Sequence, residues 1–105
     1  MSESNNAQVL RIYMNESYYH ETTPVYEYLI YQARDMEMAG ATLTKGPVGF
    51  GQEELKEGIR YKLSNDIPIV LEIVDISEKV EKFLPIAQKA LAGRGLIIEF
   101  SASIR

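Results

Sequence analysis

Four segments of the chain carry the alternating or continuous apolar pattern of β-strands. Val9–Met14 alternates and is rich in strand-forming residues, and Ile67–Val74 gives the strongest strand signal in the chain. Ala41–Lys45 and Leu96–Ser101 are shorter and carry the same kind of signal. The pattern therefore predicts four strands, separated by segments of a different periodicity.

Two of those separating segments repeat apolar residues at helical spacing. In the first, the apolar stripe runs from Val25 to Met36, the pair Thr23-Pro24 predicts a capped start, and Gly40 predicts a left-handed end. In the second, the stripe runs from Val80 to Leu91, and Gly93 predicts its end. Two helices are therefore expected, each between a pair of strands.

The predicted order is strand, helix, strand, strand, helix, strand. Two strand–helix–strand units in one sheet predict a ferredoxin-like α+β fold. Its antiparallel sheet has the strand order 4-1-3-2 and carries both helices on one face. The polar residues 1–8 predict a disordered tail, and residues 9–105 predict a single domain. Residues 53–65 mix helical spacing with glycine and charge, so no element is predicted there.

Three charged residues fall near the middle of three strands. Arg11 lies on the first strand, Glu72 on the third and Glu99 on the last, and we expect them to form a cross-strand charge cluster on the face without helices. The rest of that face is too apolar to be left to water, so we expect another subunit to cover it. An ion network at a subunit interface fits this position better than acid–base chemistry, because substrate could not reach it.

Composition excludes several classes of function. The chain has 105 residues, a net charge of −4, no cysteine and one histidine, His20. Disulfides, thiolate metal sites and histidine-rich metal sites are therefore excluded, and general nucleic-acid binding lacks its basic footprint. No window approaches the roughly 20 apolar residues of a membrane span, and the N-terminus lacks a signal-peptide pattern. We expect a cytoplasmic protein that does not span a membrane.

The segment from Gly46 to Gly51 contains three glycines and one proline and follows a predicted strand. Such a cluster is typical of either a tight turn or a cradle of backbone amides for an anion. It is not a P-loop, because no Gly-Lys-Ser/Thr sequence follows. Cations that could complete a phosphate site are Lys45, Arg94 between two glycines, and Arg105 at the end of the chain. Spacing alone leaves the turn and the cradle both open.

Several short motifs together resemble a known family. The segments that carry the resemblance are Leu10-Arg11-Ile12-Tyr13, Gly40-Ala41-Thr42-Leu43-Thr44-Lys45-Gly46, Gly49-Phe50-Gly51-Gln52, Leu63 to Asp75 and Phe83-Leu84-Pro85. They are similar to the PII signalling proteins and still more to the PII-like family labelled domain of unknown function 190. The resemblance covers about Val9 to Glu99. Gln52 departs from the PII pattern, which usually has arginine after Gly-Phe-Gly.

The resemblance implies a homotrimer that binds an adenine nucleotide in clefts between subunits. A short segment after Gly51 would report nucleotide state to a protein partner, such as a membrane transporter or an enzyme. This is signalling by binding, so the resemblance implies neither a catalytic residue nor a cofactor nor a metal. The nucleotide-binding residues expected on these grounds are Lys45, Gly49, Phe50, Gly51, Gln52, Gly93, Arg94, Gly95 and Arg105.

The alternative function is a small ferredoxin-like hydrolase that acts on a phosphate or acyl-phosphate. Such an enzyme needs an arginine-bearing phosphate loop near the first strand, and Asn15-Glu16-Ser17 does not resemble one. RNA recognition by an open sheet needs exposed aromatic residues on central strands, and Tyr13 alone does not supply them. We therefore expect a regulator rather than an enzyme.

Overall fold

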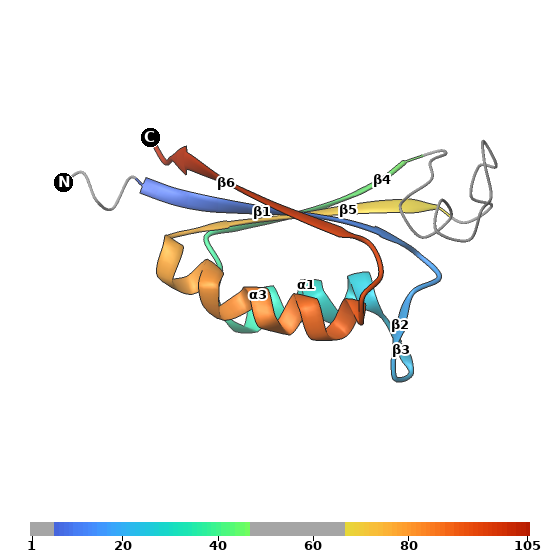
Figure 1. Cartoon of the computed structure of the whole chain (residues 1–105). Helices are drawn as coiled ribbons and strands as arrows, with labels where there is room; N and C mark the ends of the chain where they lie inside the picture. Colours follow the sequence, from blue (N-terminus) through green and yellow to red (C-terminus); the bar gives the residue numbers. More distant parts are fainter. Residues whose placement is uncertain (1–5, 47–66) are drawn as a thin grey trace.

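One antiparallel sheet of four strands forms the frame of the protein (Figure 1). The computed structural model describes residues 6–46 and 67–105. The four strands are β1 (Asn6–Asn15), β4 (Gly40–Lys45), β5 (Pro68–Asp75) and β6 (Leu96–Ser103). They lie in the order β4-β5-β1-β6, which is the predicted 4-1-3-2 order read from the other edge, so the predicted fold class is confirmed.

Both long helices lie on the same face of this sheet, as Figure 1 shows. Helix α1 (Val25–Asp35) buries Val25, Leu29 and Ala33. Helix α3 (Ser77–Leu91) buries the stripe that begins at Val80 and runs through Phe83 to its last residue. The helical spacing of these apolar residues was therefore a correct guide to the buried face of each helix.

The core lies between the helices and alternate residues of the two central strands. These residues are Leu10, Ile12 and Met14 of β1 and Ile69, Leu71 and Ile73 of β5. All six are buried, and the most exposed, Met14, shows only 6% of its surface. Burying one such side chain stabilises a fold by about 1.5–3 kcal/mol relative to leaving it exposed. These alternate residues of β1 and β5 therefore mark the face of the sheet that meets the helices.

A small hairpin, absent from our prediction, precedes α1. It pairs β2 (Tyr19–His20) with β3 (Thr23–Pro24). Thr23 was predicted to cap the helix; instead it pairs with His20, and Pro24 occupies the N-cap position without any side-chain cap bond. The hairpin is bound to the end of α3 by Arg94, which donates a hydrogen bond to the Tyr19 oxygen. Because these residues are far apart in the sequence, the local pattern did not predict the hairpin.

Two predicted boundaries also differ from the structure. Helix α1 ends at Asp35, and the left-handed residue that follows it is Glu37, with φ 56°, so Gly40 opens β4 rather than closing the helix. Strand β1 begins at Asn6, inside the predicted tail, because its first residues pair with the end of β6, where Asn6 lies opposite Ser103. Ladder bonds to β6 order this polar stretch, which carries little apolar signal of its own.

Within the parts of the chain that the structure describes, no helix is long and apolar enough to cross a membrane.

Candidate functional site

Four of the predicted site residues lie at one end of the sheet. Lys45 is the last residue of β4, and Gly93, Arg94 and Gly95 lie between α3 and β6. Because β4 and β6 run in opposite directions, the end of β4 and the start of β6 fall at the same end of the sheet. Arg105 follows the last residue of β6 and so lies at the opposite end (Figure 1). One chain therefore does not bring Arg105 to the other four residues.

The glycine-rich residues predicted to cradle a phosphate are Gly49, Phe50, Gly51 and Gln52. All four lie outside the described residues.

The side chain of Arg94 is engaged with the backbone of its own chain. Its Nε donates a hydrogen bond to the oxygen of Leu91 (2.7 Å), and its Nη2 donates to the oxygens of Ala90 (3.3 Å) and Tyr19 (3.0 Å). The guanidinium also lies over the ring of Tyr18, with its carbon 4.8 Å from the ring centre. Arg94 therefore binds two of the last carbonyls of α3 and ties the β2–β3 hairpin to that helix.

The two glycines beside Arg94 have a conformational explanation. Ala92 is the left-handed C-cap of α3, and Gly93 and Gly95 follow with φ 83° and 71°. A Cβ at Gly95 would lie 2.5 Å from the backbone oxygen of Tyr13, whereas a Cβ at Gly93 would meet nothing within 4 Å. Gly95 is thus required where the chain passes β1, which is a structural reason for the Gly-Arg-Gly motif independent of any ligand.

Lys45 lies at the free edge of β4. Its Nζ is 5.3 Å from the centre of the Tyr26 ring of α1, which is a cation–π distance. The next residue, Gly46, donates its amide hydrogen to the oxygen of Pro68 (2.9 Å), so the strand pairing with β5 continues to Gly46. Lys45 therefore lies beside α1, at the end of an edge strand that is still paired with β5.

Glu16 binds the residue that precedes β5. The amide of Glu16 donates to the oxygen of Ile67 (3.0 Å), and one Glu16 carboxylate oxygen accepts from the amide of Ile67 (3.2 Å). This contact joins the chain between β1 and the hairpin to the start of β5. Sequence reasoning missed it, because nothing in the local pattern distinguishes Glu16 from a solvated acid.

Two of the three predicted charged residues meet on the sheet face that neither helix covers. Arg11 lies directly opposite Glu72, and its Nε is 2.8 Å from a Glu72 carboxylate oxygen. The hydrogen bond to Glu72 raises the pKa of Arg11 above its ordinary value. Both side chains keep about a third of their surface exposed, 36% and 37%. The pair is therefore formed within one chain but remains open to a covering partner.

The third predicted member, Glu99, is not in this cluster. Glu99 lies opposite Leu10, so it belongs to the helix-side set of positions, and there its carboxylate accepts a hydrogen bond from Gln8 Nε2 (2.7 Å). The residue opposite Arg11 is Ile98, and the Arg11 guanidinium lies 5.0 Å from the centre of the Phe100 ring. Our prediction placed Glu99 on the face without helices, which was wrong. The register of β6 differs from the expected one by one residue, and such a shift moves every side chain of the strand to the other face.

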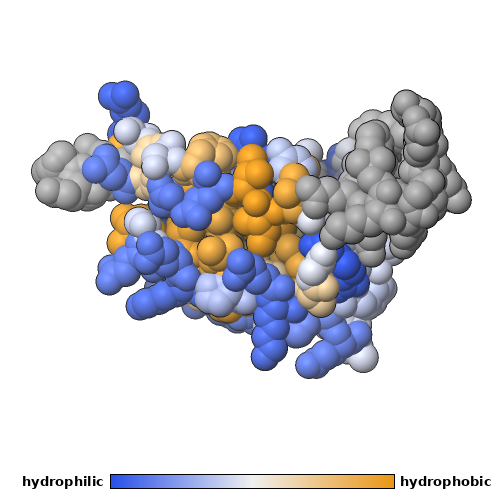
Figure 2. Space-filling model, viewed as in Figure 1, coloured by the Kyte–Doolittle hydropathy of each residue, from blue (hydrophilic) through white to orange (hydrophobic). Residues whose placement is uncertain are grey.

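With this correction, the uncovered face carries an exposed apolar row along β6. Leu96, Ile98 and Phe100 show 41%, 37% and 38% of their surface, and Tyr13 of β1 shows 37%. Figure 2, which looks at the β6 edge of the sheet, shows apolar side chains gathered in the middle of the view, where β6 passes in front of the sheet in Figure 1. An apolar face of this kind is typical of a protein–protein interface.

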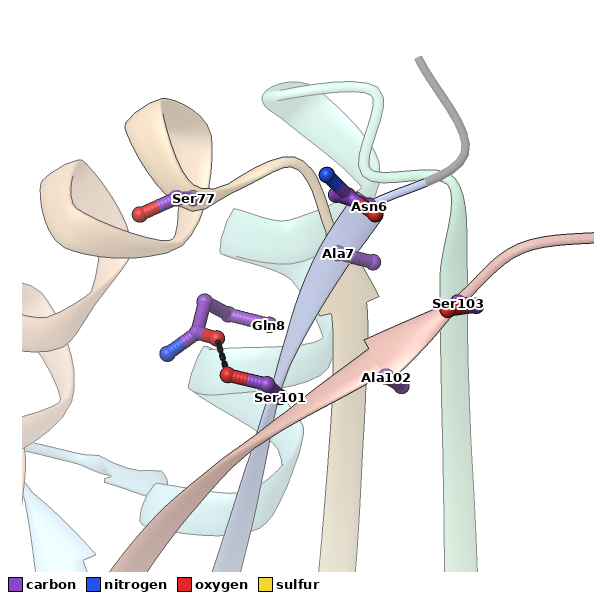
Figure 3. A pocket seen from close by; sticks show the side chains of 7 residues that line it. All are labelled: Asn6, Ala7, Gln8, Ser77, Ser101, Ala102 and Ser103. Atoms are coloured by element: carbon purple, nitrogen blue, oxygen red, sulfur yellow. Dashed lines mark hydrogen bonds between the residues drawn. The ribbon is translucent and has the colours of Figure 1, made fainter. Parts of the chain in front are cut away.

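A pocket of about 430 Å³ lies at the end of the sheet opposite Arg94 (Figure 3). The residues that line it are Asn6, Ala7, Gln8, Ser77, Ser101, Ala102 and Ser103. One contact within it is the hydrogen bond from Ser101 Oγ to Gln8 Oε1 (2.7 Å). The lining is neutral and contains none of the predicted site residues. Over residues 6–46 and 67–105, no group of three or more possible metal ligands is present.

Solved structures with the same fold include nucleotide complexes. One is CPII, a nitrogen regulatory PII-like protein from Thiomonas intermedia K12 bound to ADP, AMP and bicarbonate. It has a TM-score of 0.68 and 13% identity, and the match covers 95% of this chain and 96% of that one. Another is the Bacillus subtilis GlnK–ATP complex, with a TM-score of 0.61, 15% identity, and coverage of 97% and 84%. At these identities, the likeness shows a shared PII-like fold.

Sequence relatives are closer in identity. A UPF0166 protein of Aquifex aeolicus is 33% identical over 78 residues, which is 73% of this chain and 74% of the relative. A UPF0166 protein of Methanocaldococcus jannaschii is 32% identical over 92 residues, or 88% and 85% of the two chains. The family model of DUF190, described as uncharacterized ACR, matches residues 7–103. The chain therefore belongs to the DUF190 family, and its domain has a PII-like fold.

Proposed function

We propose that this protein is an oligomeric PII-like regulator that binds an adenine nucleotide between neighbouring chains and does not turn it over. Proteins with this fold have been solved with ADP, AMP and ATP, which supports the choice of ligand. Regulation by binding requires a pocket that changes shape or partner contacts on occupancy, and it requires no nucleophile or acid–base pair.

The observation that carries this proposal is the separation of the two cationic candidates. Lys45 ends the edge strand β4, and Arg94 precedes the opposite edge strand β6. Three interstrand spacings lie between these edges, which corresponds to about 14 Å. Within a single chain, the two cations therefore lie at the same end of the sheet but at opposite edges, too far apart to form one site.

A ring of chains would unite these two residues. If the β4 edge of one chain lies beside the β6 edge of the next, Lys45 of the first approaches Arg94 of the second. Three copies would close such a ring with the uncovered, apolar sheet faces turned toward its axis. The exposed row of Leu96, Ile98 and Phe100 supports this arrangement, because each would lose contact with water.

In the proposed cleft, Lys45 supplies a compact positive charge and Arg94 supplies a planar fork of donors to the phosphates. The amides of Gly49 to Gln52 are proposed to complete the cradle, and the turn at Gly93 and Gly95 to hold Arg94 close to the ligand. Arg105 lies at the other end of the sheet, so we leave it out of the proposed site. The partner protein expected to contact the segment after Gly51 stays a prediction.

Isothermal titration calorimetry with ADP, AMP and ATP tests the proposal, together with an assay for released phosphate. The expected result is binding in the micromolar to millimolar range, with one site per chain and no release of phosphate. Release of phosphate that depends on Arg94 would instead support the hydrolase alternative. A native oligomer that binds none of the three nucleotides would contradict the proposal.

A further inference from the structure

The β2–β3 hairpin is a short element that contacts both helices. Each of its strands has two residues, and an isolated hairpin of that size is not stable in water. Figure 1 shows it projecting from the helix side of the molecule, away from the sheet. At its base, the amide of Val25 donates a hydrogen bond to the oxygen of Tyr18 (2.8 Å), and the rings of His20 and Tyr28 lie 4.4 Å apart. Arg94 adds a further tie, which joins the Tyr19 oxygen to the end of α3.

The donors of Arg94 are divided between α3 and the hairpin. Nε donates to Leu91, and the two protons of Nη2 have two acceptors, the oxygens of Ala90 and Tyr19. The edge of the guanidinium formed by Nε and Nη2 thus faces the end of α3. The other edge, formed by Nη1 and Nη2, is the remaining fork for a bidentate anion.

Because Ala90 lies beside Leu91 at the end of α3, we assign the Nη2 proton on the Nε edge to Ala90 and the one in the remaining fork to Tyr19. A phosphate held by both donors of the fork must therefore take the place of the Tyr19 oxygen. Both the Tyr19 oxygen and a phosphate accept from the charged guanidinium, but the phosphate is itself charged and can accept two parallel hydrogen bonds, so it competes well with one neutral carbonyl. The contacts with Leu91 and Ala90 lie on the other edge and need not change.

We propose that Arg94 is a switch between the nucleotide and the hairpin, so that a phosphate in its fork releases Tyr19 and loosens the β2–β3 hairpin. This inference rests on the proposed function and adds a second reporting element, on the helix side of the molecule. A looser hairpin would also affect the residue before β5. Glu16, two residues before Tyr18, binds Ile67 through both its amide and its carboxylate. Tyr19, with 52% of its surface exposed, would be the side chain most directly displaced.

Hydrogen–deuterium exchange of the full-length protein, with and without saturating ADP, tests this coupling. The reporter is the peptide that spans residues 18–25, which contains the Val25 amide. In the wild type, ADP should speed its exchange about tenfold, the effect expected from losing one hydrogen bond to a charged donor. In Arg94→Lys, which keeps the charge but loses the fork, exchange should already be fast without ADP and should not respond to it.

Arg34→Lys is the matched control. Arg34 lies on α1 with 73% of its side chain exposed and contacts its neighbour Asp35 and the ring of Tyr31, so the hairpin should behave as in the wild type. Calorimetry on the same samples separates two failures. If the wild type binds no adenine nucleotide, the proposed function fails and this inference fails with it. If ADP binds but exchange at residues 18–25 stays the same or slows, or if Arg94→Lys leaves it slow without ADP, the switch alone is overturned.

Discussion

Arg11 and Glu72 face each other across β1 and β5, with 2.8 Å between Nε and a carboxylate oxygen, at the centre of the sheet face that neither helix covers. Apolar side chains surround this pair, and the Phe100 ring lies beside the guanidinium. If another chain covers this face, the pair loses water, and removing either partner then leaves an uncompensated buried charge. The pair therefore offers a test of the proposed assembly.

Glu72→Ala should weaken the oligomer. It leaves the Arg11 guanidinium without its partner in a covered interface, and removing one member of a desolvated pair costs about 2–5 kcal/mol. Light scattering over a dilution series should show dissociation at a higher concentration than for the wild type. Glu81→Ala, an exposed change on α3, should leave the mass unchanged. If Glu72→Ala dissociates no more readily than this control, the face is not an interface.

The corrected register of β6 makes a second prediction about the same face. Ile98 lies opposite Arg11 on the uncovered face, whereas Glu99 lies opposite Leu10. Ile98→Glu should therefore disrupt assembly, because it places a charge among apolar side chains, while Glu99→Ala should not. Size-exclusion chromatography with light scattering compares the two variants. The reverse outcome, with Glu99→Ala dissociating and Ile98→Glu intact, would restore the parity that the sequence first suggested.

Gly95→Ala should destabilise the fold far more than Gly93→Ala. Both glycines have positive φ, and a left-handed alanine costs about 1–2 kcal/mol at either position. At Gly95 the new Cβ would also lie 2.5 Å from the Tyr13 oxygen, so the backbone must move and the cost should exceed about 3 kcal/mol. Urea denaturation measures both. Equal losses of stability would show that the close approach to β1 relaxes without cost.

Asp75 should contribute stability that is lost in acid. Burial by itself would raise the pKa of Asp75, but hydrogen bonds from the amides of Ile76 (2.6 Å) and Ala39 (2.8 Å) and the contact with Lys79 outweigh burial, and the pKa lies below its ordinary value of 3.8. Because the folded pKa is the lower one, the contribution is complete above pH 3.8 and disappears as pH falls through the folded value.

Asp75→Asn should therefore lower the free energy of unfolding near neutral pH and flatten its dependence on pH below about pH 4. Urea titrations of the wild type and the variant at a series of pH values measure this difference. Asp35→Asn is the control, because Asp35 is an exposed acid at the end of α1. Parallel pH profiles for the wild type and Asp75→Asn would mean that the buried carboxylate has no net effect.

The sequence was sufficient for the fold because every second residue in the middle of β1 and β5 is a large apolar residue that meets the helices. Leu10 and Ile12 on one face and Arg11 on the other set the parity of β1, and Glu72 has the matching parity on β5, so the two charges were expected on one face. Strand β6 begins with three consecutive apolar residues, Leu96, Ile97 and Ile98, so its parity could not be read from alternation.

The candidate site was less accessible to sequence reasoning. Gly-Arg-Gly correctly marked the end of α3, but the contact of Arg94 with Tyr19 joins residues 75 apart and has no local signature. The β2–β3 hairpin takes part in this long-range contact, and a polar loop was expected in its place. The opposite positions of Lys45 and Arg94 across the sheet follow from the strand order, which the sequence predicted correctly.

The most direct test of a site shared between chains is to mix two defective variants and measure ADP binding. Lys45→Ala and Arg94→Lys should each bind ADP much more weakly than the wild type. After the two are unfolded together and refolded as mixed rings, about a quarter of the sites should regain an intact Lys45 from one chain and an intact Arg94 from the next. Calorimetry should then show wild-type affinity at that fraction of sites; no recovery in mixed oligomers of native mass would contradict a site built from two chains.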